Sequence, residues 1–285
     1  MRWFEQFIQS KWSILLLPVS LIWGIVSAIR HFFYNVGIFR TYKVNVPVIS
    51  VGNIAVGGRG KTPLVILLGK IFSSSQVAIL SRGYGGGDEI KVILRHLPKA
   101  NIYVDADRVR SAKKAVEEGA ELIVLDDGFQ HRRLHRDFDL VIVTPKDLQG
   151  RCLPAGELRD SPRQLKRAIV LSDLKIRATC PVPIKGERVA IFCGIGNPER
   201  FKNTVESLGA NVVLSLYLGD HEAIGKKRLE QFYEQSRFLN VKYLICTEKD
   251  EVKLPPNDLP IYSVRIETKV DGLEKLIATI EERLR

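Results

Sequence analysis

Residues 55–63 read AVGGRGKTP, and this stretch decides the fold of the first half of the chain. It follows VPVISVG (residues 46–52), whose β-branched side chains predict a buried strand. It opens KTPLVILLGKIF (residues 61–72), which predicts a helix with Pro63 in its first turn. The pattern is G-x-x-x-x-G-K-[ST] with Ala55 at the first glycine position. A glycine-rich turn between a strand and a helix is typical of loops that hold the phosphates of a nucleoside triphosphate.

We therefore predict that this phosphate loop binds ATP through the residues Ala55, Val56, Gly57, Gly58, Arg59, Gly60, Lys61 and Thr62. Lys61 is expected to contact the β- and γ-phosphates, and Thr62 to supply a hydroxyl to Mg²⁺. ELIVLDDGFQH (residues 121–131) places Asp126 and Asp127 directly after an apolar strand. An acid in that position beside a phosphate loop is expected to coordinate Mg²⁺, although Asp-Asp-Gly is also good chemistry for a solvated turn.

Alternating strands and helices predict an α/β fold with a doubly wound parallel sheet of the P-loop NTPase type. The strands QVAILS, FDLVIV and AIVLS alternate with helical stretches such as RVRSAKKAVEEGA. Residues 171–187, LSDLKIRATCPVPIKGE, predict an irregular linker, after which a second alternation begins with a helix capped by Asn197 and closed by Gly209. The predicted domains are an N-terminal apolar helix (1–43), a P-loop domain (44–175) and a smaller C-terminal α/β domain (176–285).

The N-terminal segment WSILLLPVSLIWGIVSAI (residues 12–29) carries no charge. As a helix it is ~27 Å long, slightly shorter than the ~30 Å hydrocarbon core of a bilayer. Basic residues outnumber acidic ones five to one within residues 1–50, which favours contact with anionic lipid. Three interpretations stay open, namely a helix buried against the protein body, an anchor lying in the membrane interface, and a transmembrane span.

The net charge of +11 over 285 residues predicts an anionic partner. Nucleic acid is not expected, because no helix-turn-helix, zinc or aromatic-basic recognition element accompanies the charge. The four cysteines have no CxxC spacing, which argues against a zinc site or a disulfide framework and favours a reducing cytoplasm. No stable protein partner is inferred.

Three classes of P-loop protein compete. A GTPase is disfavoured, because TEKD (residues 247–250) lacks the asparagine of a guanine-recognition motif. A membrane-associated positioning ATPase is the alternative function, since GGRGKT resembles its loop, but Val56 stands where that class has an extra lysine. A kinase needs a base for an acceptor hydroxyl, and Asp88 and His221, each in a glycine-containing loop, are the candidates.

The chain resembles the tetraacyldisaccharide 4′-kinase family of lipid A biosynthesis over nearly its full length. The motifs that carry the resemblance are SVGNIAVGGRGKTP, SRGYG, GDE, DADR, LDDGFQHRRLHRD, LPAGELRDSP, GIGNPERF, GDHE and TEKDEVKL. The resemblance implies transfer of the ATP γ-phosphate to the 4′-hydroxyl of a tetraacylated disaccharide 1-phosphate. It also implies work at the cytoplasmic face of the inner membrane, with the N-terminal helix as a peripheral or monotopic anchor.

The resemblance also implies roles for single residues. The catalytic residues are Asp88, His221, Lys61 and Arg159, and the metal residues are Thr62, Asp126, Asp127 and Asp160. Asp88, supported by His221, is expected to draw the proton from the hydroxyl, in a cleft between two domains that closes on the substrate. Asp160 stands where the family commonly has glutamate, so it reaches one methylene less far toward Mg²⁺. Only Gly86 separates SRGYG from GDE, which implies that a hairpin of the family is missing at the edge of the site.

Overall fold

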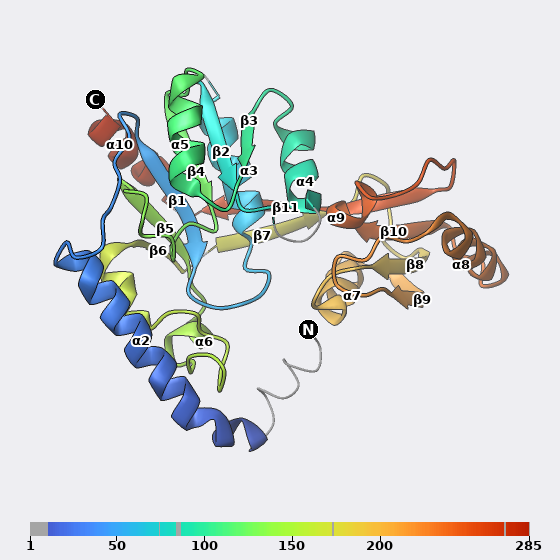
Figure 1. Cartoon of the computed structure of the whole chain (residues 1–285). Coiled ribbons are helices and arrows are strands. Elements are labelled where there is room, and N and C mark those ends of the chain that lie inside the picture. Colours follow the sequence, from blue (N-terminus) through green and yellow to red (C-terminus); the bar gives the residue numbers. More distant parts are fainter. Residues whose placement is uncertain (1–10, 74, 84–86, 173, 271, 285) are drawn as a thin grey trace. The chain divides into compact units, whose positions relative to one another are not determined.

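The computed structural model describes residues 11–73, 75–83, 87–172, 174–270 and 272–284, and the chain divides into two compact units (Figure 1). The P-loop unit takes its described residues from 3–83, 96–175 and 268–285, and the second unit takes them from 84–95 and 176–267. The units are therefore not continuous in sequence. Helix α4 (Asp88–His96) belongs largely to the second unit, and the last helix, α10 (Leu273–Leu284), belongs to the P-loop unit.

The P-loop unit is built on a six-stranded sheet with the order β3-β2-β4-β1-β5-β6, and every neighbouring pair is parallel. This confirms the predicted doubly wound α/β fold. The strands are β1 (Val48–Asn53), β2 (Val77–Ser81), β3 (Asn101–Val104), β4 (Leu122–Asp126), β5 (Phe138–Ile142) and β6 (Ile169–Leu171). All residues of β1, β4 and β5 are buried, as expected for central strands of a parallel sheet that is covered on both faces.

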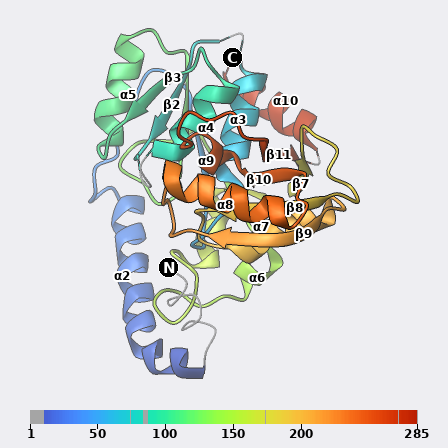
Figure 2. The ribbon, with the colours of Figure 1, turned by 90° about the vertical axis from the view of Figure 1, so that its right-hand side faces the viewer.

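Helices cover both faces of this sheet. Helix α5 (Arg108–Glu117) shares a core cluster with Ala78 and Leu80 of β2. The side chain of Ile79 between them is also fully buried and must point to the opposite face, since side chains alternate along a strand. Helix α3 (Lys61–Ile71) packs against β1 and β4 and buries Leu64 and Leu68. Figure 2 shows α3 and α5 in a second view, together with β2 and β3. The shorter helices of this unit are α6 (Pro145–Leu148) and η3 (Pro162–Arg167).

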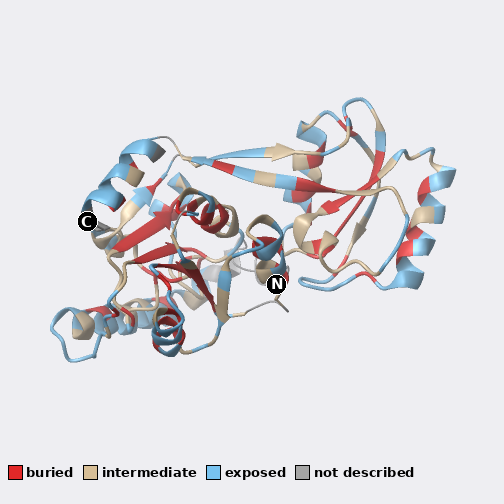
Figure 3. Ribbon diagram, turned by 90° about the horizontal axis from the view of Figure 1, so that it is seen from above, coloured by how far each residue is buried: buried red, intermediate tan, exposed pale blue. Residues whose placement is uncertain are grey.

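The second unit contains a five-stranded sheet with the order β7-β11-β10-β8-β9. Its strands are β7 (Leu174–Thr179), β8 (Arg188–Cys193), β9 (Asn211–Tyr217), β10 (Tyr243–Thr247) and β11 (Ile261–Val270), and its helices besides α4 are α7 (Pro198–Ser207), α8 (Lys226–Phe238) and α9 (Glu248–Glu251). The predicted caps of α7 are confirmed, because Asn197 Oδ1 accepts the N–H of Arg200 and Gly209 has a φ of 88°. The prediction of an irregular linker over residues 171–187 is wrong, since β7 lies within it at the edge of the sheet and exposes three of its six residues. Figure 3 shows the buried residues concentrated in the strands of both sheets.

Helix α2 (Leu17–Asn35) follows the short η1 (Lys11–Leu16). Its burial pattern is inverted with respect to a helix of a water-soluble protein, because it buries polar side chains and exposes apolar ones. Its two buried residues, Ser20 and His31, are polar. Its exposed side chains include Leu21, Ile22, Trp23, Ile25, Val26, Ile29 and Phe32. Among the described residues, this is the one helix with the length and composition to cross a membrane, and only 11% of its apolar window is buried. The interpretation as a helix buried against the body is therefore wrong.

Candidate active site

The phosphate loop runs from the end of β1 to the start of α3. Gly57 and Gly60 have φ values of 100° and 85°, a region that side chains with a Cβ rarely adopt, so glycine is required at both turns. Gly60 directly precedes α3, and the helix N-terminus adds its positive dipole end to the loop. The N–H of Val56 donates to the carbonyl of Glu157 at 2.8 Å, so this amide is used to brace the loop.

The two acids after β4 have different environments. Asp126 is the last residue of β4, is 4% exposed, and is paired in register with Val51 of β1 next to the loop. Asp127 has a φ of 52°, which is uncommon for a residue other than glycine and is often found at functional sites. Its carboxylate lies 3.3 Å from Lys61 Nζ and accepts Arg159 Nη1 at 2.8 Å. Burial alone would raise the pKa of Asp127, but these two cations lower it below its ordinary value.

Arg159 joins the loop to the acidic pair. Its Nη2 donates to Asn53 Oδ1 at 2.7 Å, and its Nε donates to the carbonyl of Ala55 at 3.4 Å. Lys61 Nζ lies 3.5 Å from the same Asn53 oxygen. The predicted residues Lys61, Asp127 and Arg159 are therefore brought together. Asn53, which is fully buried, was not predicted, and its signal is its position as the last residue of the strand before the loop.

Arg108 is a second residue that sequence patterns did not single out, although it lies in the DADR motif. It is 4% exposed, and burial lowers the pKa of its guanidinium while the nearby carboxylate of Asp126 acts in the opposite direction. Its cationic side chain is therefore held within the electrostatic reach of the acidic pair.

Asp160 contacts the N-terminal helix. Its Oδ1 accepts His31 Nε2 at 2.8 Å and Ser27 Oγ at 2.9 Å, and its side chain is 2% exposed. Burial would raise the pKa of this carboxyl, but the hydrogen bonds from His31 and Ser27 lower it below its ordinary value. The residue expected at the metal is thus held by side chains of α2.

The predicted Asp88–His221 pair is formed within the second unit. His221 Nδ1 lies 3.0 Å from Asp88 Oδ2, and Asp88 is 1% exposed. His221 has a φ of 61°, and its N–H donates to the carbonyl of Gly194 at 2.9 Å, so the backbone fixes an unusual conformation here. The expectation that the two residues lie on different domains is wrong. The reason is that the start of α4 leaves the P-loop unit and packs on the second unit.

Ion pairs from α9 and the residues after it hold α4 in the second unit. Lys253 Nζ lies 3.7 Å from Asp88 Oδ2 and 3.2 Å from Asp250 Oδ1, and its side chain is 12% exposed. Lys249 and Glu89 form a further pair at 2.5 Å. Lys253 was not predicted from the sequence. The position at which a hairpin of the family is expected to be missing falls at residues 84–86, which are outside the described residues.

Comparisons with known proteins agree with one another. A family model described as Tetraacyldisaccharide-1-P 4'-kinase matches residues 12–285. Relatives named tetraacyldisaccharide 4'-kinase include one from Syntrophus aciditrophicus, 31% identical over 92% of this chain and 90% of the relative. Another, from Syntrophotalea carbinolica, is 34% identical over 88% of this chain and 86% of the relative. The crystal structure of LpxK from Aquifex aeolicus in complex with ATP has a TM-score of 0.80 and 27% identity, covering 96% of this chain and 99% of that chain.

Proposed function

Because the chain belongs to the tetraacyldisaccharide-1-P 4'-kinase family, we propose that its P-loop unit holds the phosphate donor and that its Asp88–His221 pair activates the acceptor. The chain is an ATP-dependent kinase of lipid A biosynthesis. The observation that carries the assignment of residues is the convergence of Lys61 and Arg159 on Asp127 beside the phosphate loop. Two cations lie within 3.3 Å of one carboxylate, and a triphosphate can replace that carboxylate as their anionic partner.

At the donor end, Lys61 binds the β- and γ-phosphates of ATP, and the N–H groups between Gly57 and Thr62 surround them. Arg159 stabilises the charge that spreads over the oxygens of the transferred phosphoryl group. Asn53 supports this arrangement, because its Oδ1 accepts Arg159 and thereby orients the guanidinium.

Mg²⁺ fits the oxygen donors at this end of the sheet. Thr62 lies in the first turn of α3, and Asp126 ends the strand next to β1. Mg²⁺ commonly uses one or two carboxylates together with substrate phosphates, and the described residues contain no cluster of three or more His, Cys, Asp or Glu side chains for another kind of metal site. Thr62, Asp126 and Asp127 would hold the ion. When bound, it neutralises charge on the phosphates.

At the acceptor end, the Asp88–His221 pair removes the proton from the 4′-hydroxyl of the acylated disaccharide 1-phosphate. Asp88 is the base, and His221 Nδ1 fixes its Oδ2 at 3.0 Å.

The inverted helix α2 carries the enzyme to its lipid substrate at the cytoplasmic face of the inner membrane. Its exposed apolar side chains suit lipid, and arginines gather near its C-terminal end. Arg30 and Arg132 lie 5.8 and 5.3 Å from the ring of Tyr34, and Arg40 and Arg133 lie 5.1 and 5.5 Å from the ring of Tyr42. Such cations attract anionic lipid head groups.

Label transfer from γ-labelled ATP to a tetraacyl disaccharide 1-phosphate in mixed micelles tests the proposal. We expect label on the lipid with the unchanged protein and a loss of about 10²- to 10⁴-fold with Asp88→Ala, while the affinity for ATP stays similar. Asp258→Asn, an exposed carboxylate of the same unit, is the matched control. Unchanged transfer by Asp88→Ala would contradict the base assignment. ATP hydrolysis stimulated by anionic vesicles without labelled lipid would favour the positioning ATPase instead.

A further inference from the structure

Helix α2 is attached to the segment 152–160 by polar contacts rather than by an apolar seam. Ser20 Oγ donates to the carbonyl of Cys152 at 2.6 Å, and Trp23 Nε1 donates to the carbonyl of Arg159 at 3.4 Å. The two donors to the Asp160 carboxylate, His31 and Ser27, complete the attachment. These contacts join residues more than 125 positions apart in the sequence, so they must form with the tertiary fold.

The segment that α2 holds is part of the phosphate site. The N–H groups of Arg159 and Asp160 both donate to the carbonyl of Ile54, at 2.7 and 3.3 Å, so this segment lies along the start of the phosphate loop. Asp160, whose carboxylate α2 holds, therefore directly follows Arg159, whose guanidinium contacts Asp127 and Asn53. A shift of Asp160 moves the backbone that carries Arg159.

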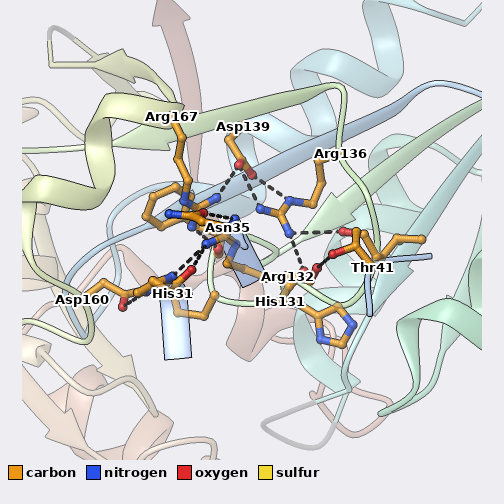
Figure 4. A network of polar contacts seen from close by, with 12 residues as sticks. His31, Asn35, Thr41, His131, Arg132, Arg136, Asp139, Asp160 and Arg167 are labelled. Atoms are coloured by element: carbon orange, nitrogen blue, oxygen red, sulfur yellow. Dashed lines mark hydrogen bonds and ion pairs between the residues drawn. The ribbon is translucent and has the colours of Figure 1, made fainter. Parts of the chain in front are cut away.

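The neighbours of His31, which Figure 4 shows around the imidazole, indicate which ring nitrogen donates and which accepts. Arg132 Nη1 lies 3.4 Å from His31 Nδ1 and donates to the His31 carbonyl at 3.0 Å. A guanidinium can only donate, so Nδ1 is the acceptor and Nε2 carries the hydrogen toward Asp160. His31 is thus a hydrogen-bond donor to a buried carboxylate, and removing it leaves that carboxylate with one donor fewer.

We propose that His31 and Ser27 are positioning residues for phosphoryl transfer, because they fix Asp160 and thereby the placement of Arg159. This inference rests on the role proposed above for Arg159. It makes the helix that faces the lipid a structural part of the phosphate site.

A double-mutant cycle between His31→Leu and Arg159→Met tests the inference with single-turnover label transfer. A small displacement of a positioned group can cost one to two orders of magnitude in rate. We expect His31→Leu to lower the transfer rate roughly 10- to 100-fold, and to lower it no further when Arg159 is already methionine. His31→Gln, whose amide can donate from nearly the same place, is expected to restore most of the rate. If His31→Leu does not fold, Ser27→Ala enters the same cycle.

A control on the outer face of α2 separates positioning from membrane binding. Ile22 is 61% exposed, so Ile22→Asn is expected to weaken binding to anionic vesicles and to affect transfer equally with and without Arg159. An unchanged rate in His31→Leu, or equal effects of His31→Leu in both backgrounds, would overturn the positioning role. If Arg159→Met alone leaves transfer unchanged, the proposed role of Arg159 fails and this inference fails with it.

Discussion

Replacement of Asp127 by asparagine tests whether this carboxylate occupies the two cations of the phosphate site before a nucleotide binds. Arg159 donates to it at 2.8 Å, and Lys61 lies 3.3 Å away. A triphosphate that recruits both cations must displace the carboxylate and overcome its negative charge. Asparagine removes both obstacles, so the variant should bind metal-free ATP more tightly than the unchanged protein.

The exposure of the three side chains sets the size of the effect. Exposed ion pairs contribute up to about 1 kcal/mol, whereas removing one partner of a fully buried pair costs about 3–5 kcal/mol. The side chains of Lys61, Asp127 and Arg159 are 18%, 30% and 26% exposed. We therefore take the free energy needed to displace the carboxylate from the two cations as about 1–2 kcal/mol, between the values for exposed and buried pairs. At about 1.4 kcal/mol per factor of ten, Asp127→Asn should strengthen ATP binding roughly 5- to 30-fold.

Titration calorimetry with ATP in the presence of EDTA measures this change. Glu121→Gln is the control, because it removes one negative charge from an exposed position in the same unit and should leave the affinity unchanged. With Mg²⁺ present the expectation reverses for turnover, which should fall because a proposed metal ligand is lost. Equal or weaker binding of metal-free ATP by a folded Asp127→Asn variant would refute the competition that we derive from the ion pairs.

Three further changes have defined outcomes. Lys253→Met removes the cation next to Asp88 and should lower kcat about 10-fold with ATP affinity unchanged, as measured by steady-state transfer. Burial, with Arg108 and Arg136 nearby, lowers the pKa of His131 from 6.5 to about 4, so the native state favours the neutral ring. The free energy of unfolding should therefore decrease as the pH falls from 6.5 toward 4. His131→Asn should reduce this dependence in urea unfolding at pH 5 and pH 7.5. Gly52→Ala would place a Cβ 2.5 Å from Phe129 Cβ, so thermal unfolding should show that the free energy of unfolding falls by about 1–3 kcal/mol. The clash should also displace the loop that carries Asp127 and thereby weaken ATP binding.

The parts of the fold that the sequence predicts well depend on local patterns. The strand, glycine turn and helix around residues 48–71 follow from β-branched residues, positive-φ glycines and helix chemistry that lie next to one another in the chain. Asp126 could be placed at the end of a strand for the same reason. Strand β7 was missed because the prolines and glycine that suit a linker follow it closely, at Pro181, Pro183 and Gly186, and a neighbouring strand rather than local preference makes it extended.

The relations between distant residues could not be read from the chain. Asp88 follows the second strand of the P-loop sheet in sequence, yet ion pairs such as Lys249–Glu89 hold its helix on the second unit. Sequence order alone assigns Asp88 to the wrong unit, because nothing local signals that the chain leaves the sheet there. The partner of Asp160 was likewise hidden, since His31 lies 129 residues earlier, just after the uncharged segment 12–29.

The polar residues of α2 acquire meaning only when the helix is seen to be inverted. In a water-soluble helix a histidine among apolar residues belongs to the exposed face, whereas here His31 is 2% exposed and the apolar side chains face outward. Buried polar groups must be hydrogen-bonded, so an inverted helix can attach only where the body offers polar partners. The body offers Asp160 and the carbonyls of Cys152 and Arg159, which belong to the segment that braces the phosphate loop. The same inversion that suits the helix to lipid thus directs its attachment to the phosphate site.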